Sequence, residues 1–125
     1  TLVDSIAKKI RAVEDMVARL ELGNVTVITG RVEDDALLRR CGGKMDVVLA
    51  RAVTQLPALV RWSVPLLRRG GQRRLLVWKG GALGEEIEEA RRHPGVARIQ
   101  EYPIRLPGED YFEREEKKIV EVTFT

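Results

Sequence analysis

Four charged residues stand where chemistry could be carried out, because each follows a stretch whose hydrophobic pattern is typical of a β-strand. They are Asp4, Glu33, Arg51 and Lys79. In doubly wound α/β folds, ligands bind outside the carboxyl ends of the parallel strands. If the strands belong to one parallel sheet, the four side chains meet at one edge of it. One charged strand end is ordinary, whereas four at one edge indicate a binding or catalytic site.

Asp4 has two possible roles at the end of the first predicted strand. A carboxylate offers acceptor oxygens side by side, so it could accept hydrogen bonds from both hydroxyls of a nucleoside ribose. Alternatively, Asp4 or Ser5 caps the helix that follows. Taken alone, this part of the sequence favours the capping role.

Val32 and Glu33 follow the second predicted strand. Their backbone amides could bind the edge of an adenine ring, and the Glu33 carboxylate could accept a hydrogen bond from the amino group of that ring. Alternatively, Arg31 and Glu33 form an ion pair on a surface loop. The pattern does not decide between the two interpretations.

Arg51 follows the nearly continuous apolar run Met45–Ala50, which is typical of a strand buried on both faces of a parallel sheet. Its guanidinium carries donors in a fixed fork that suits a phosphate or a carboxylate. Lys79 ends the next strand in the same way. Trp78 is interpreted as a packing residue, and His93 receives no catalytic role because it stands in a turn that ends a helix.

The elements that would position these residues follow from the hydrophobic period. Helical spacing predicts helices around residues 6–20, 34–40, 54–64 and 85–92, the third capped by Thr54. Strands are predicted at residues 1–3, 25–29, 45–50, 74–78, 96–105 and 118–124, and a turn-rich stretch at 106–116. Alternating strands and helices predict an α/β fold with a mostly parallel sheet. The last two strands have no helix between them, which predicts one antiparallel strand.

The bulk composition predicts a single globular domain over residues 1–125, with 44% hydrophobic and 33% charged residues. The net charge of +3 is compatible with a nucleic-acid partner but does not require one. A single cysteine, Cys41, allows no internal disulfide and predicts a reducing, cytoplasmic setting. With one histidine far from it in sequence, we expect no metal site, and the lack of a long apolar run predicts no membrane span.

Several of these segments, taken in order, resemble the ribosomal RNA small-subunit methyltransferase G family, also called the glucose-inhibited division protein B family. The matching runs are Leu2–Ser5, Lys8–Lys9, Leu22–Asn24, Arg31–Glu33, Asp46–Val48, Ala50–Val53 and Val77–Gly80. The Arg-Val-Glu run followed later by the Ala-Arg-Ala run is the most specific pair. Order and spacing agree from Leu2 to about Glu89, and beyond Arg92 the resemblance rests on the strand pattern alone.

The resemblance implies a class I, Rossmann-like methyltransferase that transfers a methyl group from S-adenosyl-L-methionine (AdoMet) to the N7 nitrogen of a guanine in bacterial 16S ribosomal RNA. It implies that Asp4 and Ser5 lie near the ribose of AdoMet, and Val32 and Glu33 near its adenine. Arg51 would lie beside the cofactor and the target base, as the catalytic residue. Lys79 would face phosphates of the RNA.

The family's first strand and its glycine-rich loop have no counterpart in this chain, so the resemblance predicts a partial domain whose sheet lacks a strand. The missing strand belongs between the strands that start near Thr1 and Met45. The edges it leaves would have unpaired backbone groups. Either the chain is a fragment, or the sheet closes differently, or another chain fills the gap, which includes self-association. We expect this chain alone to bind AdoMet poorly. The family also has a bulky aromatic residue where this chain has Ala12.

Two rival functions follow from the same observations. One is a non-catalytic α/β module that binds RNA or a partner chain through its basic turns, in which case RNA binding should depend on salt and AdoMet should not bind. The other is a nucleotide-dependent oxidoreductase. That class also needs a glycine-rich first turn, and the Arg-Val-Glu and Ala-Arg-Ala runs argue against it.

Overall fold

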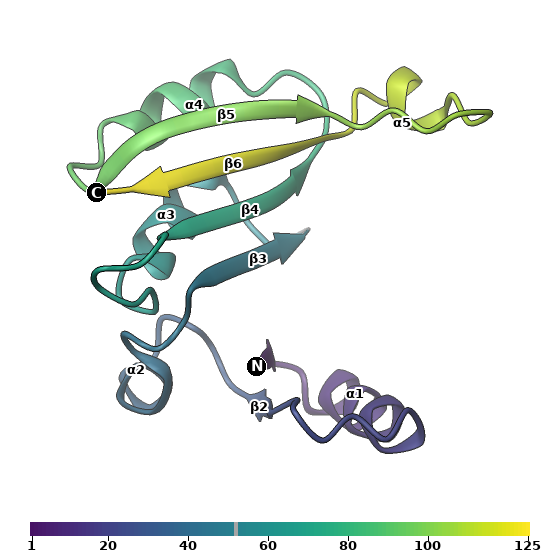
Figure 1. Ribbon diagram of the computed structural model, residues 1–125, viewed down its shortest axis with the longest axis vertical. Coiled ribbons are helices and arrows are strands. Elements are labelled where there is room, and N and C mark those ends of the chain that lie inside the picture. The colour runs from purple at the N-terminus through teal and green to yellow at the C-terminus, as the bar shows by residue number, and fades with distance from the viewer. Residues whose placement is uncertain (52) are drawn as a thin grey trace. The chain divides into compact units, whose positions relative to one another are not determined.

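The computed structural model describes residues 1–51 and 53–125, which form two compact units, Thr1–Arg40 and Cys41–Thr125. Ala52, in the Ala-Arg-Ala run, lies outside the described residues. Whether the two units make up the single domain predicted for residues 1–125 stays a prediction. The elements, in chain order, are β1 (Leu2–Asp4), α1 (Ala7–Arg19), β2 (Val27–Thr29), α2 (Asp35–Cys41), β3 (Val47–Arg51), α3 (Leu56–Ser63), β4 (Arg74–Lys79), α4 (Gly84–Arg91), β5 (Val96–Pro103), α5 (Tyr111–Arg114) and β6 (Lys118–Phe124) (Figure 1).

The first unit contains two parallel strands, β1 and β2, joined through helix α1. Leu2 pairs with Val27 and Asp4 with Thr29, so both strands end at the same edge. Helix α1 buries Ile10 on its apolar stripe and ends at Arg19. Glu21 follows with a φ of 53°, a backbone conformation that ends the helical path before Gly23. The predicted helix is confirmed, and the strand expected from Val25 begins at Val27.

The second unit contains a four-stranded sheet in the order β3-β4-β6-β5. Strand β3 is parallel to β4, whereas β6 is antiparallel to both of its neighbours, β4 and β5. In this sheet β6 is therefore the strand that runs against the others, which confirms the predicted α/β sheet with one antiparallel strand. The absence of a strand between β1 and β3 stays a prediction, because the two strands belong to different units.

The core of the second unit lies between one face of this sheet and the helices α3 and α4 (Figure 1). Leu75 and Val77 of β4 and Val120 and Val122 of β6 are at most 1% exposed. Successive side chains of a strand point to opposite faces. The intervening residues therefore point away from α3 and α4, and Leu49 of β3 is 63% exposed.

Helix α3 packs through Leu56, Leu59 and Val60, as its spacing predicted, and ends before Pro65, which cannot continue the hydrogen bonding of a helix. The turn-rich stretch at 106–116 contains the short helix α5, which the sequence pattern did not predict. No helix in the described part of the chain has the length and apolar character needed to span a membrane.

Substituting Leu75→Ala should lower the free energy of unfolding by about 2–5 kcal/mol, because it leaves a cavity in a fully buried position. The matched control is Leu49→Ala on the neighbouring strand, where the exposed side chain should cost about 0.5 kcal/mol or less. Urea unfolding followed by circular dichroism measures both. Equal losses for the two variants would show that the helices do not cover the face assigned here.

Candidate functional site

Asp4 is the last residue of β1, and its carboxylate is half-buried. Its Oδ1 atom accepts a hydrogen bond of 2.8 Å from the backbone N–H of Ile6. The helix itself begins one residue later, with Ile6 rather than Asp4 or Ser5 in the N-cap position. Among the described residues Oδ2 has no hydrogen-bond partner, so the local contact orients the carboxylate and leaves one oxygen for another donor.

The turn that carries Val32 and Glu33 lies at the same edge as Asp4. The backbone N–H of Gly30 donates to the carbonyl oxygen of Asp4 over 3.0 Å, which continues the pairing of β1 and β2 by one step. In the described part of the chain, the amides of Val32 and Glu33 meet no acceptor. Arg31 and Glu33 do form an ion pair, 3.8 Å between Nη1 and Oε1, but an exposed pair of this length contributes little.

Arg51 ends β3 and pairs in register with Trp78 of β4. Leu49, Ala50, Arg51 and Trp78 together line a hollow at the carboxyl ends of these two strands. The interpretation of Trp78 as a packing residue is wrong, since it is 41% exposed. The alternation along β4 could have shown this, because Val77 is buried and the next side chain must point to the other face.

Lys79 ends β4 on the other face of the sheet from Trp78, and its side chain is 15% exposed. Its Nζ atom donates to Oε2 of Glu86 over 2.8 Å and to the carbonyl oxygen of Thr54 over 3.0 Å. The contact with RNA phosphates stays a prediction for Lys79. In the structure its positive charge is paired with a carboxylate of the same unit.

Glu86 was not singled out from the sequence, yet its carboxylate joins α4 to α3. The same Oε2 atom accepts a hydrogen bond of 2.7 Å from the backbone N–H of Leu56, the first residue of α3. The prediction that Thr54 caps this helix is wrong. Gln55 occupies the N-cap position without a side-chain cap, and Glu86 satisfies the amide from 30 residues away. No spacing rule reveals such a contact in a single sequence.

Opposing effects act on the Glu86 carboxyl. Burial alone raises its pKa, but the hydrogen bonds from Lys79 and Leu56 and the attraction of the ammonium outweigh burial. The pKa of Glu86 is therefore lowered from its ordinary value of 4.5. A carboxyl whose pKa is lowered by folding stabilises the folded state above its unfolded pKa, and that contribution is lost as the pH falls through the folded pKa.

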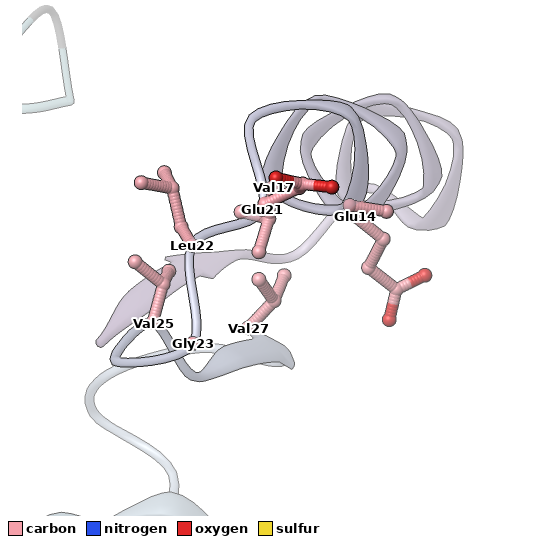
Figure 2. A pocket seen from close by; sticks show the side chains of 8 residues that line it. Glu14, Val17, Glu21, Leu22, Gly23, Val25 and Val27 are labelled. Atoms are coloured by element: carbon pink, nitrogen blue, oxygen red, sulfur yellow. The ribbon is translucent and has the colours of Figure 1, made fainter.

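A second hollow lies in the first unit, between the last turns of α1 and the start of β2 (Figure 2). Val17, Leu22 and Val27 line it together with two carboxylates, Glu14 and Glu21. It lies at the amino end of β2, opposite the edge where α/β sheets bind ligands. No residue of the predicted site lines it, and its negative charges disfavour phosphate. No cluster of metal-binding side chains occurs in residues 1–51 and 53–125.

The substitution Glu86→Gln should lower the free energy of unfolding at pH 7 by about 1–2 kcal/mol, because a neutral amide bonds less strongly to the ammonium. Glu85→Gln is the matched control, since it removes the same charge from the first turn of α4 but its side chain is exposed. The difference between wild type and Glu86→Gln should shrink as the pH falls below about 4.5. Urea unfolding at pH 7 and pH 3 tests this, and a constant difference would contradict the ionised pair.

Comparison with known proteins finds one family model and many curated relatives. The family model described as GidB, rRNA small subunit methyltransferase G, matches residues 1–114. A ribosomal RNA small subunit methyltransferase G of Roseiflexus castenholzii is 40% identical over 111 residues, covering 86% of this chain and 47% of that protein. The enzyme of the same name from Mycolicibacterium smegmatis is 46% identical over 92 residues, covering 74% of this chain and 37% of that protein.

The chain thus spans between about a third and a half of the length of these curated relatives. Among solved structures, a precorrin 8W decarboxylase of Methanobacterium thermoautotrophicum is similar in fold, with a TM-score of 0.57. It is 23% identical, and the match covers 98% of this chain and 67% of that one. That likeness supports the fold alone. The family match over residues 1–114 shows more: this chain belongs to the rRNA small subunit methyltransferase G family.

Proposed function

We propose that the full-length gene product carrying this chain is an AdoMet-dependent methyltransferase that modifies the N7 nitrogen of a guanine in bacterial 16S ribosomal RNA, in the cytoplasm. The family match supports the class of reaction. The observation that carries the assignment of a site is the pairing of Arg51 with the exposed Trp78 at the carboxyl ends of β3 and β4. The forked guanidinium of Arg51 beside the flat indole of Trp78 suits a planar, electron-rich base.

The first unit fits the adenosine part of AdoMet. Asp4 offers a carboxylate oxygen without a protein partner among the described residues, which suits the ribose hydroxyls, and Ser5 follows it directly. The amides of Val32 and Glu33 and the Glu33 carboxylate lie at the same edge and suit the donors and acceptors of adenine. A contact of Arg51 with the cofactor rests on the family resemblance alone. When bound, AdoMet supplies a methyl group on a sulfonium, an electrophile that needs no further activation.

The guanine N7 nitrogen holds a free lone pair in the plane of the ring, so no residue has to remove a proton from it before transfer. The remaining task for the protein is orientation, which contributes about 7–11 kcal/mol to well-aligned reactions. Arg51 should donate to the guanine O6 atom or to a neighbouring phosphate and leave N7 unbonded. Trp78 offers its indole face to the base, a contact worth about 1–3 kcal/mol. The target base must be unpaired or flipped out to reach them.

AdoMet binding, measured by calorimetry, tests the cofactor assignment. The full-length gene product should bind, and this chain by itself should bind poorly. In the full-length protein, Asp4→Asn should weaken binding by about 10- to 100-fold, because a hydrogen bond to a charged group is worth about 1.5–3 kcal/mol. Asp15→Asn is the control, since Asp15 pairs with Arg19 on the exposed side of α1. If no form of the protein binds, the roles of Asp4, Glu33 and Arg51 are wrong, and salt-sensitive RNA binding would then favour a non-catalytic module.

Arg51→Ala in the full-length protein should lower methyl transfer to small-subunit RNA by about 100-fold or more, which is the usual loss when an electrostatic donor is removed from an active site. The unfolding free energy should change by about 0.5 kcal/mol or less, because the side chain is exposed. Arg61→Ala, which removes a charge from the exposed side of α3, is the control. Incorporation of labelled methyl groups measures the rate, and unchanged turnover in Arg51→Ala would remove this residue from the site.

A further inference from the structure

Three segments of the second unit are tied together by the Lys79–Glu86 pair. Lys79 ends β4, Glu86 lies in the first turn of α4, and the pair holds both the carbonyl oxygen of Thr54 and the N–H of Leu56. The two charged side chains are 15% and 24% exposed. Each bond is between 2.7 and 3.0 Å long, so the geometry of the cluster is well defined.

The two backbone groups held by the pair lie just after Arg51 in sequence. On one side, Arg51 is fixed by its register with Trp78, the neighbour of Lys79 in β4. On the other side, Thr54 and Leu56 are fixed by the bonds to Lys79 and Glu86. The chain between these anchors is only a few residues long. Because Thr54 stands three positions after Arg51, a shift of Thr54 would change the constraint on Arg51.

The charges around Glu86 indicate that Lys79 and Glu86 bind to each other and to the protein backbone rather than to RNA. The N–H groups at the start of a helix attract a negative charge, and the Glu86 carboxylate fills that role for α3. The ammonium of Lys79 is the counter-charge of that carboxylate, at 2.8 Å. An RNA phosphate approaching Lys79 would meet the negative charge of Glu86 beside it.

Resting on the proposed function, we propose that Lys79 and Glu86 form a positioning pair that fixes Thr54 and the start of α3 and so aligns Arg51, three positions before Thr54, for methyl transfer. Neither residue contacts the reacting base in this role. The pair acts through Thr54 and Leu56.

The variant Glu86→Ala separates this role from a phosphate contact by Lys79. If Lys79 served mainly to bind phosphate, removal of the neighbouring carboxylate would leave RNA binding unchanged or make it tighter. If the pair positions Arg51, the loss of Glu86 must instead reduce kcat, as the loss of Lys79 does. The double variant should then be no worse than the more damaging single variant, because the two residues act as one unit.

The first experiment compares the steady-state kinetics of Lys79→Met, Glu86→Ala and the double variant in the full-length protein. All three should lower kcat by about 10- to 100-fold, the scale of a misplaced catalytic group, while the KM for RNA changes by less than about threefold. Glu85→Ala, the exposed neighbour, should match wild type. Unchanged kcat in Glu86→Ala, or a higher RNA KM alone in Lys79→Met, would overturn the proposal.

The second experiment follows the Leu56 amide by nuclear magnetic resonance and needs no activity. Its hydrogen exchange should be roughly tenfold faster or more in Glu86→Ala than in Glu85→Ala, because the amide loses its acceptor. If Glu86→Ala does not fold, Glu86→Gln serves instead, where the shift of the Leu56 amide should change. Equal exchange or an unmoved shift would overturn the pair. A wild-type protein that methylates no small-subunit RNA would refute the proposed function, and the amide measurement would still decide whether the pair holds the start of α3.

Discussion

The Glu86 carboxylate satisfies two needs at once. It accepts the first N–H of α3, which would otherwise lack an intrahelical partner, and it balances the charge of Lys79 at the end of β4. Both bonds go to one oxygen atom, so strand β4, helix α4 and the start of α3 are held at a common point. Thr54, three positions after Arg51, is held at that point by Lys79. A site at the ends of β3 and β4 therefore depends on a residue that does not belong to it.

The strands of the second unit's sheet alternate between side chains that pack on helices and side chains that stay exposed. One set of side chains, including Leu75 and Val120, packs on α3 and α4 and stabilises the unit. The other set includes Leu49, Arg51 and Trp78, which are exposed and line the hollow at the strand ends. Side chains that are neighbours in sequence, such as buried Val77 and exposed Trp78, therefore lie on opposite faces of the sheet. The parallel register brings Arg51 and Trp78 side by side without any contribution from helices.

Local periodicity predicted most of the fold, because helices and strands in this chain follow their hydrophobic patterns closely. The strand predicted at residues 118–124 is the observed strand β6, Lys118–Phe124. The apolar spacing of α3 correctly predicted that Leu56, Leu59 and Val60 are buried. What could not be predicted depends on long-range contacts. Helix α3 is capped by Glu86 instead of Thr54, and the exposure of Trp78 follows from the face of the sheet to which it points. As site residues, Asp4, Glu33, Arg51 and Lys79 stay predictions from the sequence, whereas the contacts of Glu86 were found only in the structure.

The order of strands has a consequence for how the second unit folds during synthesis. Strand β6 follows β5 in the sequence, yet it lies between β4 and β5 in the sheet. Arg74 finds its partner Thr123 only after every other element of the unit has left the ribosome. Until then, β4 and β5 each have an open edge and an apolar face, and such surfaces are prone to aggregate. Only when β6 pairs with both β4 and β5 are these two edges closed.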